Sequence, residues 1–465
     1  MNDPAASPDP RAAALRRTAF AAANIAAFLT PFMSSAINVA VPAIGKEFSM
    51  SAVALGWVAT AFMLPAAMCL VPLGRIADIV GRRKIFALGL GVHTAATALA
   101  ALAPSGAVLI AARGLQGVGG AMIFGTAIAV LTSVFPAGER GRVLGWNTAA
   151  TYLGLSLGPV LGGFLVHGWG WRSIFWITAL VSLAAFVLVL TRLDEEWAEA
   201  RGENFDWAGA AVFGLGLIAL MYGFSRLRSP LGLALTAGGL AALAGFFRIE
   251  SRAVSPVLDL RLFRANRIFL FSNLAALVNY SSTWAVGFLL SLYLQYIKGL
   301  PPHKAGLVLI AQPLVMALAS PFAGKLSDRS EPRTIASFGM ALTAAALALF
   351  AFLRAGTPLP VLLFGLAVLG LGFGLFSSPN TNAVMGSVDR RSYGVASATL
   401  GTMRLSGQML SAGITMMIFS VFLGGNPIVP RLYPEFLFGL RAAFMLYALL
   451  CTAGVFASLA RGRRG

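Results

Sequence analysis

Residues 74–84 read Gly-Arg-Ile-Ala-Asp-Ile-Val-Gly-Arg-Arg-Lys, and they follow a strongly apolar stretch of the chain. A related segment, Gly324-Lys-Leu-Ser-Asp-Arg329, follows another apolar stretch 250 residues later. Gly74 allows two helices to approach closely, and Gly81 permits a tight turn. Asp78 can accept hydrogen bonds from helix-end N–H groups or from basic side chains across an interface between two halves. Because the pattern occurs twice, we interpret it as a paired structural device rather than an ordinary basic loop.

A second repeat has nearly the same offset. Gly145 and Gly158 correspond to Gly394 and Gly407, 249 residues later. Two matches at nearly one offset indicate two homologous halves, and paired halves with a site between them are common in secondary transporters. We therefore expect a six-helix bundle, a linker with two inserted membrane helices, and a second six-helix bundle, over residues 1–192, 193–266 and 267–465.

The composition places most side chains in lipid. Apolar residues make up 58% of the chain and charged residues 11%, and the mean hydropathy is +0.80. Soluble domains carry about 25% charged residues. Fourteen apolar stretches reach the ~20 residues that cross a bilayer. They lie near residues 18–42, 52–74, 85–104, 107–135, 143–167, 171–191, 207–225, 230–247, 268–296, 304–324, 334–353, 358–385, 394–423 and 437–460. The sequence predicts an all-α membrane protein with fourteen spans.

The placement of the charges predicts the orientation. The net charge is +18, but Lys and Arg lie in short runs between apolar stretches, which argues against nucleic-acid binding. With both termini cytoplasmic, inner segments hold 24 basic residues and outer segments 8. This asymmetry favours a multi-pass protein of the cell (inner) membrane with both termini inside. The first stretch is too long for a signal peptide, so we expect it to be retained as a span. Cys69 and Cys451 lie far apart and form no disulfide framework or metal-ligand pattern.

Five motifs, in order along the chain, resemble those of the major facilitator superfamily. The loop Gly74–Lys84 resembles its loop 2–3 motif, Leu109–Gly119 its fourth-helix motif, and Gly154–Gly163 the fifth-helix motif of its antiporters. Ile37–Pro42 and Phe205–Gly209 resemble the fourteen-span drug:proton antiporter branch. The resemblance implies the major facilitator fold and alternating access by two six-helix bundles around a central cavity. It also implies that the loop 74–84 steadies one access state.

One group of candidate residues concerns conformational change. In the fifth span, Gly154, Gly158 and Gly162 recur every four residues and form a smooth stripe for helix packing, while Pro159 frees a backbone carbonyl and bends the helix. Small-residue packing without a conformational role is the alternative. The gating candidates are Gly74, Asp78, Arg82, Arg83, Gly154, Gly158, Pro159, Gly162, Asp328 and Arg329.

A second group consists of polar and aromatic residues within the spans. An arginine at mid-membrane costs about 3 kcal/mol on insertion scales, so Arg113 should face the interior, unless it snorkels to the interface. Arg404, Gln408, Ser411 and Thr415 form a polar stripe at helical spacing, which we interpret as cavity lining, with helix contact as the alternative. The expected substrate-binding residues are Arg113, Gln116, Asn38, Tyr152, Tyr280, Trp284, Arg404 and Gln408.

Acidic residues are absent from the middle of every span. All 17 Asp and Glu fall in tails, loops or helix ends, and Met33 stands where the antiporter branch normally has an aspartate. His93 and His167 are single histidines without sequence partners, and we expect structural roles for them. Protons therefore remain a candidate coupling ion without an obvious site. A basic interior without carboxylates suits an anionic, zwitterionic or neutral substrate better than a cation.

We therefore predict a secondary active transporter that exports a small amphiphilic organic compound or drug, as a monomer without cofactor or metal. The alternative is a proton-uncoupled facilitator or importer of an anionic or neutral metabolite. A membrane-embedded enzyme would need a cluster of catalytic groups within the spans, and the sequence contains none. A purely sensory protein would need a soluble output domain, and no long polar segment is present.

Overall fold

The computed structural model describes residues 10–198, 201, 207–250, 263, 266–388 and 393–462. Within these residues every regular element is helical, and fourteen helical stretches are long and apolar enough to cross a membrane. The expectation of an all-α protein with fourteen spans is confirmed. The helices are α1 Pro10–Glu47, α2 Ala52–Thr60, α3 Met63–Val80, α4 Arg82–Ala101, α5 Gly106–Val134, α6 Ala137–Trp169, α7 Arg172–Arg192, α8 Trp207–Ser225, α9 Pro230–Glu250, α11 Arg267–Thr283, α12 Ala285–Leu292, the π-helical turn η1 Tyr293–Ile297, α13 Pro302–Leu309, α14 Ala311–Arg329, α15 Pro332–Phe350, α16 Leu359–Met385, α17 Tyr393–Phe422, the 3₁₀ turn η3 Pro430–Leu432 and α18 Tyr433–Leu459.

Among the described residues, three spans are interrupted between helical segments within their length, at the junctions α2–α3, α11–α12 and α13–α14. Pro65 lies four residues after the junction of α2 and α3 at Ala61, and Pro313 follows the junction of α13 and α14 at Ile310. A proline has no N–H to bond the carbonyl four residues earlier, so it weakens the helix at such a junction. Between α11 and α12, the Ala285 N–H donates to the Ser411 Oγ at 3.1 Å, so a side chain of α17 stabilises this junction.

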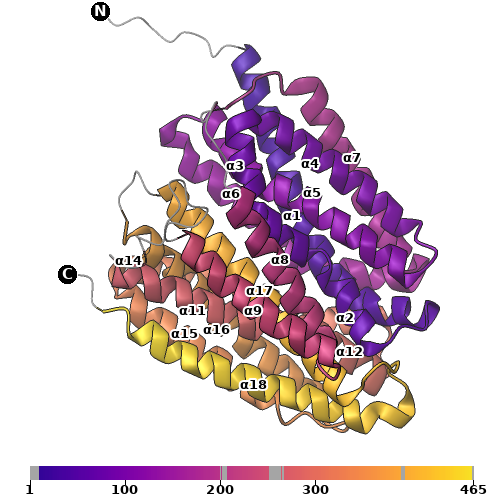
Figure 1. Ribbon diagram of the computed structural model, residues 1–465. Helices are drawn as coiled ribbons and strands as arrows, with labels where there is room; N and C mark the ends of the chain where they lie inside the picture. The colour runs from indigo at the N-terminus through magenta and orange to yellow at the C-terminus, as the bar shows by residue number, and fades with distance from the viewer. Residues whose placement is uncertain are drawn as a thin grey trace, which may run out of the picture.

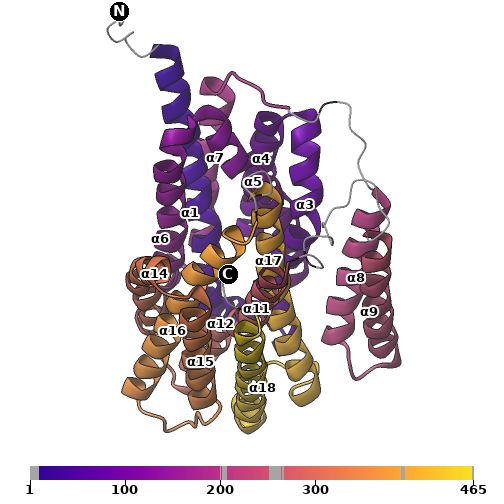
Figure 2. The same cartoon turned by 90° about the vertical axis from the view of Figure 1, so that its left-hand side faces the viewer.

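The helices form two groups with a seam between them (Figure 1). In the first group, α1 packs along α6, and α4 packs along α5 and α7. In the second, α11 packs along α17, and α15 packs along α16 and α18. We call α1–α7 the N-bundle and α11–α18 the C-bundle. Figure 2 shows the first group above the second, with the pair α8–α9 at one flank.

The two bundles contact each other at the end of the molecule far from both termini. The Ser291 Oγ donates to the Asn38 carbonyl at 2.6 Å, and the Gln295 Nε2 donates to the Val39 carbonyl at 3.0 Å. In the adjoining loops, the Ala52 N–H donates to the Asn426 carbonyl at 3.1 Å. These bonds lie near the second half of α1, so this end of the seam is closed.

The pair α8–α9 lies beside the seam and touches both bundles. α8 packs against α3 of the N-bundle and α17 of the C-bundle, while α9 packs mainly against α8. The Arg228 guanidinium in their connecting loop donates to the Val421 carbonyl near the end of α17. This hairpin therefore bridges the two bundles from outside. The division of the chain at residues 192/193 and 266/267 stays a prediction.

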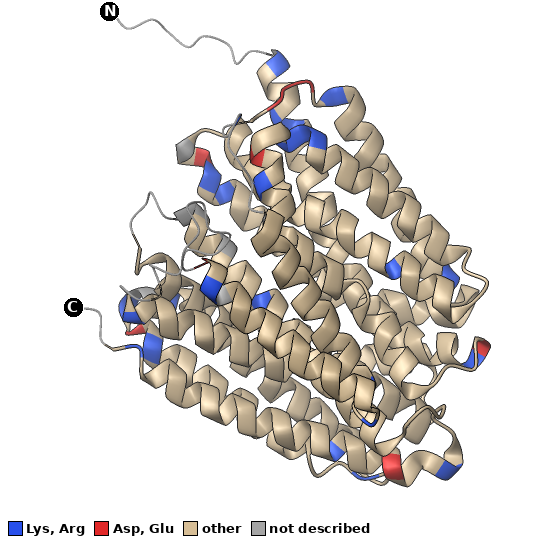
Figure 3. Ribbon diagram, in the orientation of Figure 1, with Lys and Arg blue, Asp and Glu red and all other residues tan. Residues whose placement is uncertain are grey.

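Charged side chains gather at the ends of the helices, and the helix shafts are almost free of them (Figure 3). Among the described acidic residues, Glu47, Asp78, Glu139 and Glu435 all lie in the first or last turn of their helices or close to it. Met33, at the position where the antiporter branch has an acid, is 2% exposed within the apolar core. The interior of the spans therefore depends on neutral polar groups and a few arginines.

Candidate functional site

Arg113 lies inside the N-bundle, where a polar chain links three helices. It is 1% exposed, its Nε donates to the Val58 carbonyl at 3.3 Å, and its Nη1 donates to the Gln116 Oε1 at 2.5 Å. The Gln116 Nε2 then donates to the Thr97 Oγ1 on α4 at 2.8 Å. The guanidinium also lies 5.3 Å from the ring centre of Phe62. A buried charge is tolerated only with such partners, so Arg113 and Gln116 act here as one unit.

The same chain of polar groups continues toward α7. The Thr97 Oγ1 donates to the His93 carbonyl at 2.5 Å, and the His93 Nδ1 lies 3.2 Å from the Ser182 Oγ. The expectation that His93 has no partner is wrong, because its ring contacts Ser182. The sequence could not show this partner, because Ser182 lies 89 residues further along the chain. The structural role that we expected for this histidine fits its 1% exposure.

A second cluster lies in the C-bundle around Arg404 on α17. Its Nη2 donates to the Thr381 Oγ1 at 2.7 Å, and its guanidinium lies 5.7 Å from the ring centre of Tyr280. The Arg404 Nε is buried without a hydrogen-bond partner. The Tyr280 ring packs edge-on against Phe373, with 5.2 Å between the ring centres. We call Arg404, Tyr280 and Thr381 the Arg404 cluster.

The Arg404 cluster faces the N-bundle. Tyr152 on α6 belongs to the other bundle and is close enough to Tyr280 to act on it electrostatically. Tyr152, Tyr280, Arg404 and Gln408 are all partly exposed, in contrast to Arg113 and Gln116. Two of the eight expected binding residues, Tyr280 and Arg404, are therefore in contact, and Gln408 lies one helical turn from Arg404 on α17.

Asn38 and Trp284 lie where the bundles are in direct contact. The carbonyl of Asn38 accepts the bond from Ser291, while its side-chain Oδ1 is buried without a partner. Trp284 packs against a cluster formed by residues of α3, α8 and α17. In this conformation both residues belong to the closed end of the seam.

Ser411 and Thr415, the C-terminal half of the polar stripe on α17, contact a neighbouring helix instead of lining a cavity. Ser411 and Thr415 are at most 2% exposed. Tyr447 on α18 donates to the Ser411 carbonyl at 2.6 Å, and its hydroxyl lies 2.7 Å from the Thr415 Oγ1. Our interpretation of these two residues as cavity lining is wrong, because helix–helix hydrogen bonds satisfy them.

The glycine stripe of α6 packs directly on α1. A Cβ at Gly162 would lie 2.8 Å from the Ala36 Cβ, and Cβ atoms at Gly154 and Gly158 would collide with Phe28 and Ser35. On the opposite side, a Cβ at Gly306 of α13 would collide with the Pro159 carbonyl. α6 therefore packs closely both within its bundle and across the seam.

The loop 74–84 makes its described side-chain bonds within the N-bundle. The Arg82 Nε donates to the Asp78 Oδ1 at 2.8 Å, and its Nη1 donates to the Ser133 Oγ on α5 at 2.9 Å. Gly74 faces Gly125 of the same helix α5. In the second copy, Arg329 is exposed, and the side chain of Asp328 lies outside the described residues. Only Gly81 of this segment lies between α3 and α4, and Asp78 at the end of α3 bonds Arg82 at the start of α4 rather than a group across the seam, as its sequence suggested.

A histidine pair at the closed end was missed in the sequence. The ring centres of His167 on α6 and His303 on α13 lie 4.2 Å apart, and Phe164 lies 5.9 Å from His303. His167 therefore has a partner, contrary to our expectation. His303 follows two prolines at the start of α13, and nothing in that segment signals a histidine partner in the other bundle. Ser291 and Gln295 were also missed, although their spacing of four places them on one helical face.

Comparison with known proteins agrees with this architecture. The family model of the Major Facilitator Superfamily matches residues 23–278 and 272–464. The chain belongs to the major facilitator superfamily. It is therefore a multi-pass membrane transporter and not an enzyme, as the sequence predicted.

Several relatives cover most of this facilitator. The riboflavin transporter RibZ of Clostridioides difficile (strain 630) is 29% identical over 434 residues, 93% of this chain and 94% of the relative. The multidrug resistance protein Stp of Mycobacterium tuberculosis (strain CDC 1551 / Oshkosh) is 30% identical, with 86% and 75% covered. The tetracenomycin C resistance and export protein of Streptomyces glaucescens is 28% identical, with 83% and 73% covered.

One solved structure shows the same fold. A bacterial homologue of the human lysosomal transporter Spinster, in an inward-facing and unoccupied conformation, superposes with a TM-score of 0.72. It is 18% identical and covers 98% of both chains, so the likeness concerns the fold alone.

Proposed function

We propose that this facilitator is a secondary active exporter of a small amphiphilic organic compound, which it moves by alternating access. The Arg404 cluster carries the proposal. It presents a guanidinium with an unpaired Nε beside a tyrosine and opposite Tyr152 of the other bundle. An aromatic surface with hydrogen-bond donors suits an amphiphilic ligand, which needs apolar contact and a few fixed polar groups.

The charge of this region favours an anionic, zwitterionic or neutral compound. No carboxylate lies within ion-pair distance of Arg113 or Arg404 in the part of the chain that the structure describes. A cationic drug in the seam would therefore meet the uncompensated charge of Arg404, with that of Arg113 buried behind it, whereas a carboxylate or phosphate would find a forked donor at Arg404. The export direction is supported by relatives named for drug resistance and export. The relative named as a riboflavin transporter supports the second candidate, a facilitator or importer of a neutral or anionic metabolite.

We further propose that the substrate passes along the seam between Tyr152 and the Arg404 cluster. Arg113 and Gln116 would contribute to substrate binding from within the N-bundle. The closed end near Asn38 and Trp284 would open in the other access state. Any coupling to protons would use a group other than a mid-span carboxylate, because every Asp and Glu falls in a tail, loop or helix end of the sequence.

Counterflow into proteoliposomes tests this proposal. The purified protein is offered a panel of anionic, zwitterionic, neutral and cationic amphiphiles. We expect saturable exchange of non-cationic compounds by the wild type. The Arg404→Ala variant should show no exchange, and the Arg404→Lys variant should keep part of it. Arg431→Ala, an exposed residue at the opposite end of the C-bundle, is the control and should exchange normally. Exchange of cations alone, or full exchange by Arg404→Ala, would refute the assignment.

A further inference from the structure

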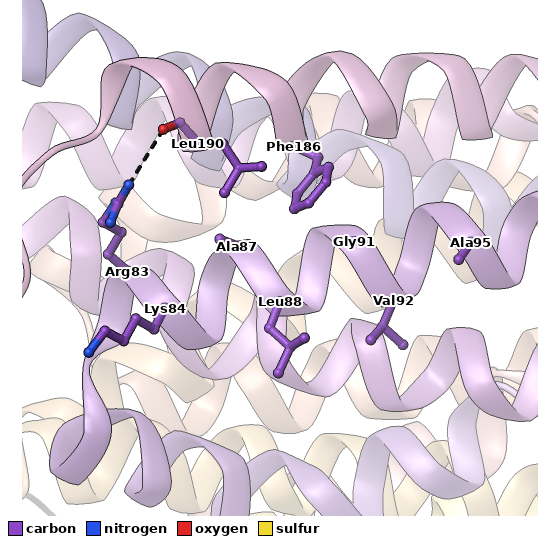
Figure 4. A pocket seen from close by; sticks show the side chains of 9 residues that line it. All are labelled: Arg83, Lys84, Ala87, Leu88, Gly91, Val92, Ala95, Phe186 and Leu190. Atoms are coloured by element: carbon purple, nitrogen blue, oxygen red, sulfur yellow. Dashed lines mark hydrogen bonds between the residues drawn. The ribbon is translucent and has the colours of Figure 1, made fainter.

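An apolar groove runs along the outer surface of the N-bundle, between α4 and α7 (Figure 4). Its volume is about 550 Å³. Its walls come from Ala87, Leu88, Gly91, Val92 and Ala95 of α4 and from Phe186 and Leu190 of α7. Because Gly91 has no side chain, the groove can deepen beside the Phe186 ring, where a Cβ would come within 3.2 Å.

Two basic residues, Arg83 and Lys84, stand at one end of this groove. The Arg83 Nη2 makes only a long bond, 3.5 Å, to the Leu190 carbonyl, and its Nε is buried without a hydrogen-bond partner. Lys84 is exposed. Neither side chain forms an ion pair among the described residues. The nearby carboxylate of Glu196 accepts a bond from the Arg83 backbone N–H at 2.9 Å instead. The groove therefore ends in two cationic groups with unused donors.

The groove lies on a surface that meets lipid. Leu88 on its wall is 52% exposed, and Ala95 is exposed, on a helix that belongs to a membrane span. A long apolar trough with positive charge at one end matches a molecule with an apolar chain and a negative head. Basic pockets between membrane helices are known to bind the headgroups of anionic lipids.

We propose that this groove binds one anionic phospholipid, with an acyl chain between α4 and α7 and its phosphate on Arg83 and Lys84. The phosphate oxygens would accept hydrogen bonds from the exposed Lys84 ammonium and from the terminal nitrogens of the partly exposed Arg83 guanidinium. A lipid in this place connects the loop 74–84 to α7, and so holds one end of the N-bundle together. The inference does not depend on which compound is transported.

Native mass spectrometry of the full-length protein in detergent tests the site, with phosphatidylglycerol and phosphatidylcholine of identical acyl chains as probes. We expect one tightly retained phosphatidylglycerol and weaker retention of phosphatidylcholine. Each basic side chain near an anionic headgroup contributes a similar amount to the free energy of lipid binding. The double variant Arg83→Gln/Lys84→Gln should therefore weaken the binding of phosphatidylglycerol by roughly thirty-fold. Lys84→Gln alone changes an exposed residue and should give a smaller loss in a protein that folds normally.

Two further variants separate the groove from its charges. Ala95→Trp fills the groove from an exposed position and should remove the bound lipid although both cations remain. Arg142→Gln removes an exposed charge at the same end of the molecule and should bind lipid like the wild type. Equal retention of both lipids, unchanged binding in the double variant or in Ala95→Trp, or equal competition by glycerol phosphate without acyl chains would each overturn the proposal. If the groove is instead covered by a second copy of the chain, seen as a dimer that excludes the lipid, the proposal is also overturned.

Discussion

At the scale of single residues, Arg113 shows how a charge is kept inside a membrane bundle. Its guanidinium is held by the Val58 carbonyl and the Gln116 side chain, and Gln116 is held in turn by Thr97. Hydropathy and spacing predicted that Arg113 faces the interior. They could not predict the roles of Val58 and Thr97, because Val58 meets Arg113 and Thr97 meets Gln116 only through the packing of α2, α4 and α5.

We predict that Arg113→Ala abolishes transport. The substitution removes the donor to the Gln116 Oε1, and an unsatisfied buried group costs about 1–3 kcal/mol. Arg113→Lys should recover part of the activity if charge suffices, and little if both the Val58 and Gln116 bonds are needed. Flux in proteoliposomes, normalised to folded protein, measures the effect. Undiminished flux in Arg113→Ala would show that the network is dispensable.

Asp78→Asn should reduce transport by about five- to tenfold with little change in membrane abundance. The carboxylate accepts a charge-assisted bond from Arg82, and the amide of equal shape keeps only about half of its strength. Asp194→Asn, an exposed acid after α7, is the matched control. Full activity of the purified Asp78→Asn protein would show that the segment 74–84 only sets the orientation of the chain in the membrane.

At the scale of helices, the close packing of α6 against α13 limits how the bundles can separate. Gly306→Ala places a Cβ against the Pro159 backbone, which cannot move aside as a flexible side chain could. We predict that this variant loosens the closed end, so that a cysteine at Ser291 is alkylated faster. Gly145→Ala on α6, where a Cβ meets nothing within 4 Å, should leave the alkylation rate unchanged. Equal rates in both variants would contradict the packing argument.

The helices also show which parts of the fold the sequence can predict. All fourteen spans follow from length and hydropathy, and the glycine stripe of α6 was found from its spacing alone. The interruptions near Pro65 and Pro313 could have been found by asking which carbonyls a proline leaves unpaired. The His167–His303 pair and the Ser411–Tyr447 bond could not, because each joins residues of separate helices without a sequence signal.

At the scale of the whole molecule, the charge asymmetry predicts that both termini are cytoplasmic. Reporter fusions near Asp194 and Arg264 should both report the cytoplasm, because these positions frame the inserted pair α8–α9. A fusion at Arg354, in the loop between α15 and α16, should report the outside and serves as the control. If a fusion at either cytoplasmic position reports the outside, the orientation is wrong.

The central claim is that this facilitator moves a non-cationic compound along the seam without a mid-membrane carboxylate. Substrate flux in proteoliposomes, with and without an imposed pH step, tests it most directly in wild type and Arg404→Ala. We predict saturable wild-type flux that changes little with the pH step, because protons are then not the coupling ion of the exporter, and no saturable flux in Arg404→Ala. Strong stimulation of the wild type by the pH step would contradict the account and point to the His167–His303 pair as the proton site.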